Sequence, residues 1–475
     1  MRSTLALIIA ALALAACASV RKADVRLPAA FEAPQSAAAP AGAVALDRWW
    51  LAYGDPELTG LIDQALAANP DARSAKARLD EARANRSSTL LQTLPTGEIA
   101  TSARNTHTEQ LAGTQINIPG FSTSGDSETR SASFNVSWEV DLFGRTFAAR
   151  RAANGDVAAA RFNYEGSRAA LAAQVADAYF QARGLAIQLA DARETARIQR
   201  GLYDTAAKRA QAGLAATSDA DRVAGDLAQA DAQAANLEAE LQVQRRTLLI
   251  LAGRTSEATS VLPVTAAVGT IPAVPVSVPA ALLDRRPDVR EAHARIASAA
   301  GRRDVAARAV LPTFTLTPGI GWQKSTQPGF TTTSQNWSIG GGITQPILAI
   351  PHLLQDLKAA DARTEQAVIA YEKSVQTAFA EAEASLVRLD ADKRRVALLT
   401  GGEARAARAY QASRIGYERG LTDLPTALNA EQSWRATRTQ LTGAQVQALR
   451  QSVTAFKALG GGWEADKFPT ETQAR

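Results

Sequence analysis

The stretch from Ser131 to Ala212 contains no proline, and its hydrophobic period changes once. From Ala132 to Leu142 every second residue is apolar and the residues between are polar, which predicts a strand with one apolar face. Beyond Gly144 apolar residues recur in steps of four and three, which predicts one helix packed along a neighbouring helix. A helix from Thr146 to Ala212 would be about 100 Å long. The residues of this heptad seam are Leu171, Val175, Ala178, Ala182, Leu185, Leu189, Ala192 and Ala196.

The second half of the chain repeats the motifs of the first half in the same order. This recurrence predicts a tandem duplication of one unit that contains a helix, two strands, a long helix and a returning helix. The paired motifs are Asn69-Pro70-Asp71 with Arg286-Pro287-Asp288, Leu94-Pro95-Thr96 with Leu311-Pro312-Thr313, Tyr164-Glu165 with Tyr371-Glu372, and Gly213-Leu214 with Gly420-Leu421.

The predicted fold class is mainly α-helical, with strands that cross a membrane. The expected parts are a signal peptide (1–16), an N-terminal tether (17–45), a first repeat (46–262), a proline-rich connector (263–281), a second repeat (282–459) and a C-terminal tail (460–475). Within the repeats we expect hairpins at about 96–142 and 313–345 and long helices at about 146–212 and 352–419. Asp55 and Pro56 are suited to start a helix, as cap and first-turn residue.

The N-terminal sequence resembles a bacterial lipoprotein signal. Arg2 precedes an uncharged apolar run, and Leu14-Ala15-Ala16-Cys17 resembles a lipobox, in which the signal is cut before a cysteine that is then lipidated. The alternative is an ordinary signal peptide with an incidental cysteine near its end. Cys17 is the only cysteine of the chain, which excludes a disulfide and favours lipidation.

Composition argues against nucleic-acid binding and against an enzyme. The net charge is only +5, and basic and acidic residues are mixed along the helices rather than gathered on one face. The three histidines, His107, His293 and His352, have no metal-ligand spacing, and no catalytic triad or phosphate loop is evident. We therefore expect no cofactor and no metal. Beyond the N-terminus no run of 18 apolar residues exists, so no membrane-spanning helix is expected in the mature chain.

The strands carry the candidate membrane-facing residues, which are Phe134, Val136, Trp138, Phe314, Leu316, Trp337 and Ile339. Four strands are too few for an outer-membrane barrel, which starts at eight, so a barrel would be shared between chains. Multiples of four leave a dimer, a trimer or a tetramer open. Pro318 lies inside the third strand and removes a ladder donor, so a bulge or register shift is expected there.

Several motifs together resemble those of outer-membrane factors of the TolC/OprM type, specifically the NodT-like lipoproteins of RND efflux systems. The resemblance implies a homotrimer with a shared twelve-stranded barrel in the bacterial outer membrane and an α-helical tunnel in the periplasm. It also implies docking to a periplasmic adaptor (membrane fusion) protein and an inner-membrane RND pump, and export of drugs or other toxic compounds. The motifs are Trp49-Trp50, Asp55–Leu58, Asn69–Asp71, Trp138–Gly144, Leu282–Asp288, Gln345–Ile347 and Phe456–Trp463.

The same resemblance assigns roles near the helix ends. The turns at Gly213-Leu214 and Gly420-Leu421 are the expected adaptor contacts. The positions of the family's periplasmic gate fall on Pro425 and Asn429, and an uncharged Asn429 argues against cation binding there. Asp219 and Asp221 are further gate candidates, although Asp221 with Ser218 also has the spacing of a helix capping box.

One alternative comes from a different functional class. A periplasmic coiled-coil lipoprotein, or an adaptor-like structural protein, would share the heptads and the lipid anchor. Such a protein would not need two aromatic-bearing hairpins at matched places in a duplicated chain, which favours the channel.

Overall fold

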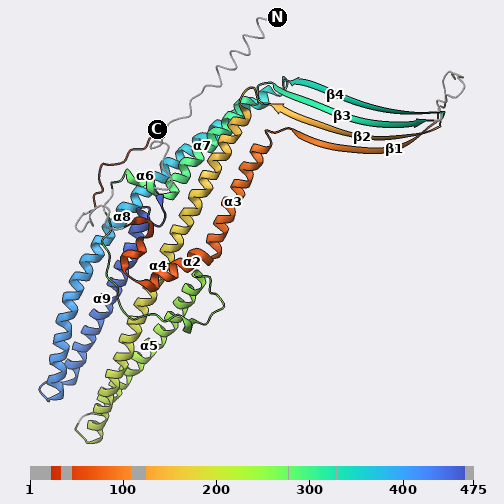
Figure 1. Ribbon diagram of the computed structural model, residues 1–475. Coiled ribbons are helices and arrows are strands. Elements are labelled where there is room, and N and C mark those ends of the chain that lie inside the picture. Colours follow the sequence, from red (N-terminus) through yellow and green to blue (C-terminus); the bar gives the residue numbers. More distant parts are fainter. Residues whose placement is uncertain are drawn as a thin grey trace. The chain divides into compact units, whose positions relative to one another are not determined.

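The computed structural model describes residues 23–33, 45–109, 111, 125–214, 216–275, 278–327 and 329–465. Figure 1 shows the elements in sequence colours. The helices are η1 (Leu46–Tyr53), α2 (Pro56–Ala68), α3 (Pro70–Leu91), α4 (Arg145–Gln211), α5 (Thr217–Leu251), η2 (Thr259–Val261), α6 (Ala281–Arg285), α7 (Pro287–Arg308), α8 (Ile350–Glu418) and α9 (Leu424–Ala458). The strands are β1 (Thr96–Thr108), β2 (Gly125–Val140), β3 (Thr313–Gln327) and β4 (Phe330–Thr344).

The chain divides into two compact units, and four long helices contribute to both. One unit contains residues 80–159 and 292–370, and the other contains residues 24–79, 160–291 and 371–475. The two uninterrupted long helices, α4 and α8, begin and end close to the expected positions. Within the described ranges, no helix combines the length and the apolar character needed to cross a membrane.

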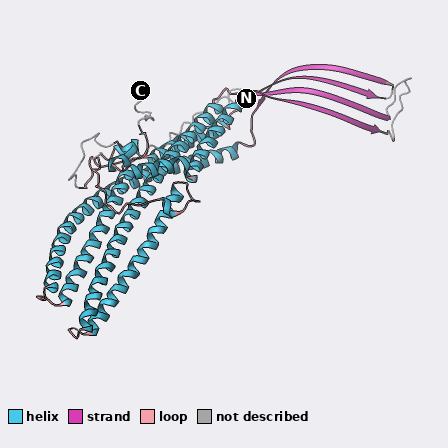
Figure 2. Cartoon of the chain, turned by 60° about the horizontal axis from the view of Figure 1, so that its bottom comes forward, coloured by secondary structure: helices cyan, strands magenta, loops and turns pink. Residues whose placement is uncertain are grey.

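The four strands form one antiparallel sheet in the order β1-β2-β3-β4. The hairpin of the first repeat and the hairpin of the second repeat are therefore neighbours, joined through β2 and β3 (Figure 2). Sequence position alone does not dictate this pairing, because β2 and β3 are separated by all of α4 to α7. The duplication thus builds one continuous surface from two distant hairpins.

The expected bulge or shift at Pro318 is not present. Pairing between β2 and β3 is interrupted opposite Thr317 and Pro318, but it resumes with Trp138 opposite Leu316 in an unchanged register. On the other side, Pro318 remains in register with Ile339 of β4. The proline removes a hydrogen-bond donor on one side only, so the strand loses local pairing without needing an extra residue.

In the unit that contains the sheet, α4 and α7 cross at two glycines. A Cβ on Gly155 would lie 2.6 Å from the Ser298 backbone nitrogen, and a Cβ on Gly301 would lie 2.5 Å from the Ala152 nitrogen. Neither position has room for a side chain. The Ser298 hydroxyl donates to Asp156 at 2.7 Å beside this crossing. At this crossing α4 of the first repeat and α7 of the second are therefore held by close backbone packing and by one side-chain hydrogen bond.

The other unit is built on the heptad seam of α4, as the sequence predicts. Every seam residue except Leu185 is buried, and Leu185 packs against the same core. Beside the seam another helix approaches α4 closely: a Cβ on Gly184 would lie 2.6 Å from Val446 of α9. Next to the seam, Trp49 of η1 stacks on Phe456 of α9 with ring centroids 5.6 Å apart.

Asp55 connects three segments of this unit. Its carboxylate accepts hydrogen bonds from the backbone of Glu57 and Leu58, which confirms it as the cap of α2. It also accepts from the Tyr179 hydroxyl of α4 at 2.9 Å and pairs with Arg183, whose Nε donates to the carbonyl of Ala267. Burial is the main reason that the pKa of Tyr179 is raised, with the carboxylate of Asp55 adding to it.

Residues 23–33 lie within the segment expected to be a tether, but they pack along α8. The Phe31 ring stacks on Phe379 with centroids 5.8 Å apart. The backbone nitrogen of Asp24 donates to Glu372 at 2.8 Å, and Val25 and Leu27 pack against Val375. An Ala- and Pro-rich composition suggests a free linker, yet these few apolar side chains are enough to hold this part of it on the helix.

Candidate functional site

The register of the sheet gathers its apolar side chains on one face. Phe134, Ile320 and Trp337 lie opposite one another on successive strands, and Trp138 lies opposite Leu316. Because alternate residues share a face, all seven predicted strand residues lie on it. The apolar residues of this face are Ile99, Ala132, Phe134, Val136, Trp138, Val140, Phe314, Leu316, Ile320, Trp322, Trp337, Ile339 and Ile343.

Several side chains of this apolar face are exposed. Trp337 is 79% exposed, and Ile339 and Ile343 are 68% and 70% exposed. The apolar band ends where Arg130 lies opposite Lys324, both of them exposed. A band of exposed apolar residues bounded by charges is the pattern of a surface that meets a lipid bilayer.

The opposite face of the sheet is polar and mostly uncharged. It carries Ser133, Asn135 and Ser137 on β2, with Thr315 and Thr317 on β3. The two faces therefore differ completely in chemistry along strands of 13 to 16 residues.

The two helix ends expected to contact a partner share one geometry. Gly213 and Gly420 have φ of 72° and 74°, in the left-handed region that favours glycine. The following leucine N–H donates to the carbonyl five positions earlier, at 2.9 Å for Leu214 and 2.8 Å for Leu421, and the glycine N–H donates to the carbonyl three positions earlier. Both ends are therefore Schellman caps.

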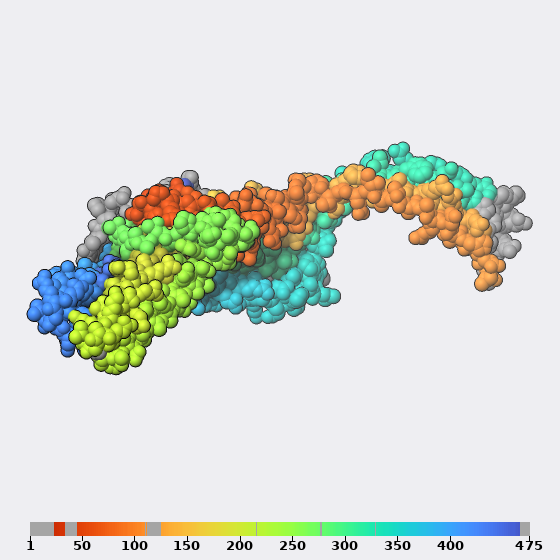
Figure 3. All heavy atoms as spheres, turned by 90° about the horizontal axis from the view of Figure 1, so that it is seen from below, coloured from red at the N-terminus to blue at the C-terminus, as the bar shows by residue number. Residues whose placement is uncertain are grey.

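Unlike many residues that follow such caps, the two leucines do not pack on the helix. Leu214 is 79% exposed and Leu421 is 77% exposed. No atom lies within 4 Å of a Cβ built on Gly213 or Gly420. Seen from below, the yellow-green end of the α4–α5 pair and the blue end of the α8–α9 pair both lie at the surface (Figure 3).

The four gate candidates lie at the starts of the returning helices. Pro425 and Asn429 are exposed and one turn apart on α9. Asp219 and Asp221 lie in the first turns of α5. The expected capping box of α5 is wrong, because the cap residue is Ala216, which makes no side-chain hydrogen bond. In α9, by contrast, the Asp423 side chain accepts from the Thr426 nitrogen at 3.0 Å.

Sequence reasoning missed the contacts that join the two helix pairs near these ends. Val223 of α5 packs with Leu424 and Leu428 of α9 in a small buried cluster. The Arg209 guanidinium of α4 lies 5.2 Å from the centre of the Tyr417 ring of α8. The spacing of Leu424 and Leu428, one turn apart and next to Asp423, was the only available signal for the apolar cluster.

A buried polar contact between Gln199 and Glu431 was also missed. Both residues are completely buried, and the Gln199 amide donates to Glu431 at 3.0 Å. Arg435 lies 3.5 Å from the same carboxylate. Burial raises the pKa of Glu431. The positive charge of Arg435 opposes this shift, and the negative charge of Asp226 adds to it. Within the described chain, one side-chain oxygen each of Gln199, Glu431 and Asp226 lacks a hydrogen-bond donor.

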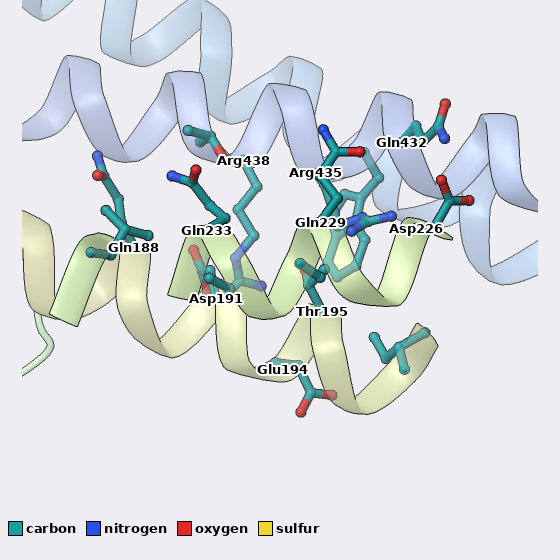
Figure 4. A pocket seen from close by; sticks show the side chains of 16 residues that line it. Gln188, Asp191, Glu194, Thr195, Asp226, Gln229, Gln233, Gln432, Arg435 and Arg438 are labelled. Atoms are coloured by element: carbon teal, nitrogen blue, oxygen red, sulfur yellow. The ribbon is translucent and has the colours of Figure 1, made fainter. Parts of the chain in front are cut away.

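The groove beside this contact is lined by polar side chains from α4, α5 and α9 (Figure 4). Arg438 of α9 reaches across it to Asp191 of α4, with 2.6 Å between nitrogen and oxygen. Several glutamines complete the lining, including Gln229 and Gln233 of α5. Ion pairs and amides therefore join the helix pairs at this level, together with apolar side chains such as Ile198 and Leu237 that also line the groove.

Comparison with known proteins now identifies the chain. The model of the family described as "Outer membrane efflux protein" matches residues 61–254 and 278–461, one range in each half. The chain belongs to the outer membrane efflux protein family. It is a channel component of efflux systems in the bacterial outer membrane that extends into the periplasm, and it is a transport protein rather than an enzyme.

Relatives and solved structures of outer membrane efflux proteins match nearly the whole chain. The pyoverdine export outer membrane protein OpmQ of Pseudomonas putida is 29% identical over 448 residues, covering 92% of this chain and 93% of OpmQ. The cation efflux system protein CusC of Escherichia coli is 26% identical, covering 88% of each. The outer-membrane channel OprN superposes with a TM-score of 0.79 at 26% identity, covering 94% of this chain and all of OprN.

Family membership decides between the two functional classes left open by the sequence. An adaptor-like or purely structural lipoprotein is excluded, and the predicted fold class of a mainly helical tandem repeat with a four-stranded sheet is confirmed. Cys17 lies outside the described residues.

We predict that Glu431→Gln makes the contact between α4 and α9 insensitive to pH. Because the pKa of Glu431 is raised, the buried neutral form is favoured, and the contact weakens as pH rises from the ordinary carboxyl range through the raised pKa. Glutamine keeps the acceptor for Gln199 without the charge. Hydrogen exchange of residues 424–435 at pH 7.5 should slow about five-fold, which corresponds to about 1 kcal/mol.

The control for this measurement is Glu418→Gln, which removes an exposed carboxylate paired with Arg414 on α8. It should leave exchange in residues 424–435 as in the parent protein. A parent protein whose exchange, corrected for the intrinsic rate, does not change between pH 4.5, the ordinary carboxyl value, and pH 7.5 contradicts the prediction.

Proposed function

We propose that three copies of this chain form the outer-membrane channel of a tripartite efflux pump. A periplasmic adaptor and an inner-membrane RND pump deliver the cargo, and the channel conducts it to the exterior. The observation that carries this proposal is the two-faced sheet, apolar and exposed on one side and polar on the other. Such a sheet needs lipid on its first face and water on its second.

The edges of the sheet support assembly with further copies. Within the described residues, β1 and β4 each pair on one side only, so their other backbone groups need partners. In lipid these groups must be satisfied by neighbouring strands, and four strands are half of the smallest known barrel. Pairing β4 of one copy with β1 of the next satisfies both edges. The family resemblance selects three copies, which gives twelve strands.

The exposed helix ends at Gly213-Leu214 and Gly420-Leu421 support the docking of an adaptor. Each presents an apolar side chain and an unobstructed backbone turn to solvent. An exposed leucine at a tight turn offers a partner helix an apolar contact and close approach. We assign Pro425 and Asn429 of α9 to the wall of the passage just inside these ends. Asp219 and Asp221 of α5 add acidic side chains to the same wall.

The cargo class is proposed from the relatives. Their names include pyoverdine export, toluene efflux and cation efflux, which are very different compounds. The family resemblance implies that the pump makes the main selection of cargo. We therefore propose export of small toxic compounds or metabolites.

Lipidation of Cys17 is proposed as an additional anchor that aids retention in the outer membrane more than channel formation. We predict that the mature protein begins at Cys17 and carries acyl chains, because the only cysteine follows Leu14-Ala15-Ala16. Intact-mass spectrometry of the purified protein checks this. An unmodified N-terminus, or one that starts elsewhere, rules the anchor out. Cys17→Ser should still assemble in the membrane through its strands.

We predict that Val136→Arg sharply lowers the yield of assembled trimers. Val136 lies on the apolar face, and an arginine facing lipid near mid-membrane costs roughly 2–4 kcal/mol in each chain. The matched control is Asn135→Arg, which places the same side chain on the polar face of the same strand and should be tolerated. Heat-modifiable mobility in gels measures the yield. Equal yields from both variants would falsify the assignment of the faces.

We predict that Gly420→Glu abolishes resistance to exported compounds while trimer abundance stays near normal. The control is Gly420→Ala, which carries the same left-handed backbone strain, about 1–2 kcal/mol, without the bulk or charge. Gly420→Ala should retain most of the resistance. Equal losses in both variants, with the adaptor still cross-linked to this turn, would show that the glycine acts only as a helix cap.

A further inference from the structure

A groove between α8 and α9 carries two arginines of α8. It measures about 570 Å³ and is lined by Arg388, Ala391, Asp392 and Arg395 of α8 and by Gly443, Gln447 and Gln451 of α9. Arg388 and Arg395 are seven residues apart and so share one helix face. Within the described part of the chain, neither guanidinium forms an ion pair or a hydrogen bond.

A neighbouring basic residue of α8, Arg394, does form an ion pair. Arg394 lies between the groove arginines in sequence but pairs with Asp390 at 3.0 Å. In the groove the only carboxylate is Asp392, so two positive charges face one negative charge. Burial raises the pKa of Asp392, with Arg395 opposing the shift. The groove is therefore positively charged.

The rest of the groove is suited to bind an anion by hydrogen bonds. Gln447 is exposed and presents amide donors, and the absence of a side chain on Gly443 leaves space between the two helices. Arg388 and Gln451 also line a second groove of about 920 Å³, which continues along α4, α7, α8 and α9. The arginine groove is therefore continuous with a longer groove and is not a closed cavity.

The groove lies on the same face of α9 as the proposed gate residues. Gln447 follows Asn429 by 18 positions, and 18 residues make about five full turns. Gly443 follows Pro425 by the same interval. The residues of α9 between them on this face are Ser433, Ala436 and Gln440, none of which is charged. Along this otherwise neutral face, the arginines of α8 supply the charge.

We propose that this groove is an anion-binding station on the wall of the passage, which takes carboxylate groups of anionic cargo. The inference rests on the proposed function, which assigns the Asn429 face of α9 to the passage. Guanidinium groups bind carboxylates through paired, charge-assisted hydrogen bonds. Three copies place six such groups within about 10 Å along the conduit, because seven helical residues span that length, so anionic compounds are favoured over cations there.

The binding test is titration of citrate, a tricarboxylate, into the full-length protein in detergent by calorimetry. The double variant Arg388→Gln/Arg395→Gln should weaken citrate binding about ten-fold or more, because it removes both charged donors. Asp392→Asn should strengthen binding, since it removes the one opposing charge. Arg394→Gln is the matched control and should bind citrate as the parent protein does. Equal citrate affinity in the parent and the double variant overturns the station.

The passage test is the reversal potential of the reconstituted channel in a potassium chloride gradient. The chloride-to-potassium permeability ratio should fall about two-fold or more in the double variant and rise in Asp392→Asn, because rings of charge set ion selectivity. Citrate binding that depends on the arginines, with the same permeability ratio in all variants, would place the groove off the passage. That outcome overturns the anion-binding station and the assignment of the α9 face to the passage. It does not bear on the proposal that the sheet lies in the membrane.

Discussion

The close packing of α4 against the helices around it is the constraint on which the rest of the structure depends. Half of the seam residues of α4 are alanine and the rest are leucine or valine, and all but the partly buried Leu185 are buried. Small side chains let Gly184 approach Val446 so closely that a Cβ would overlap it. Small side chains make shallow ridges on the helix surface, and neighbouring helices can pack closely along α4, which runs for 67 residues without a break.

Packing changes in character along this unit. Near Trp49 and Phe456 the contacts are aromatic and deeply buried, and the Asp55 cluster fixes the start of α2 against α4. Nearer the helix ends the polar contacts of Arg438 with Asp191 and of Gln199 with Glu431 join the helix pairs, together with the apolar cluster of Val223, Leu424 and Leu428.

The duplication does not make the two halves equivalent. The glycine turns match in backbone geometry, and both leucines are exposed. The helices that follow differ, because Asp423 caps α9 with its side chain whereas Ala216 offers α5 no such bond. The second half also supplies the charged groove of α8. Duplication fixed the common framework, and later divergence of single residues gave each half its own surface chemistry.

The sequence by itself determined the elements of this protein. The change of period at Gly144 located β2 and α4, the repeated motifs located their counterparts, and Asp55 marked the start of α2, because these features depend on local backbone preferences and on periodicity. Only the tertiary structure decided the pairing of β2 with β3, which unites the apolar residues on one face, and the burial of Gln199 with Glu431. Those contacts join residues more than a hundred positions apart, and no local pattern specifies which distant side chain will meet a given one.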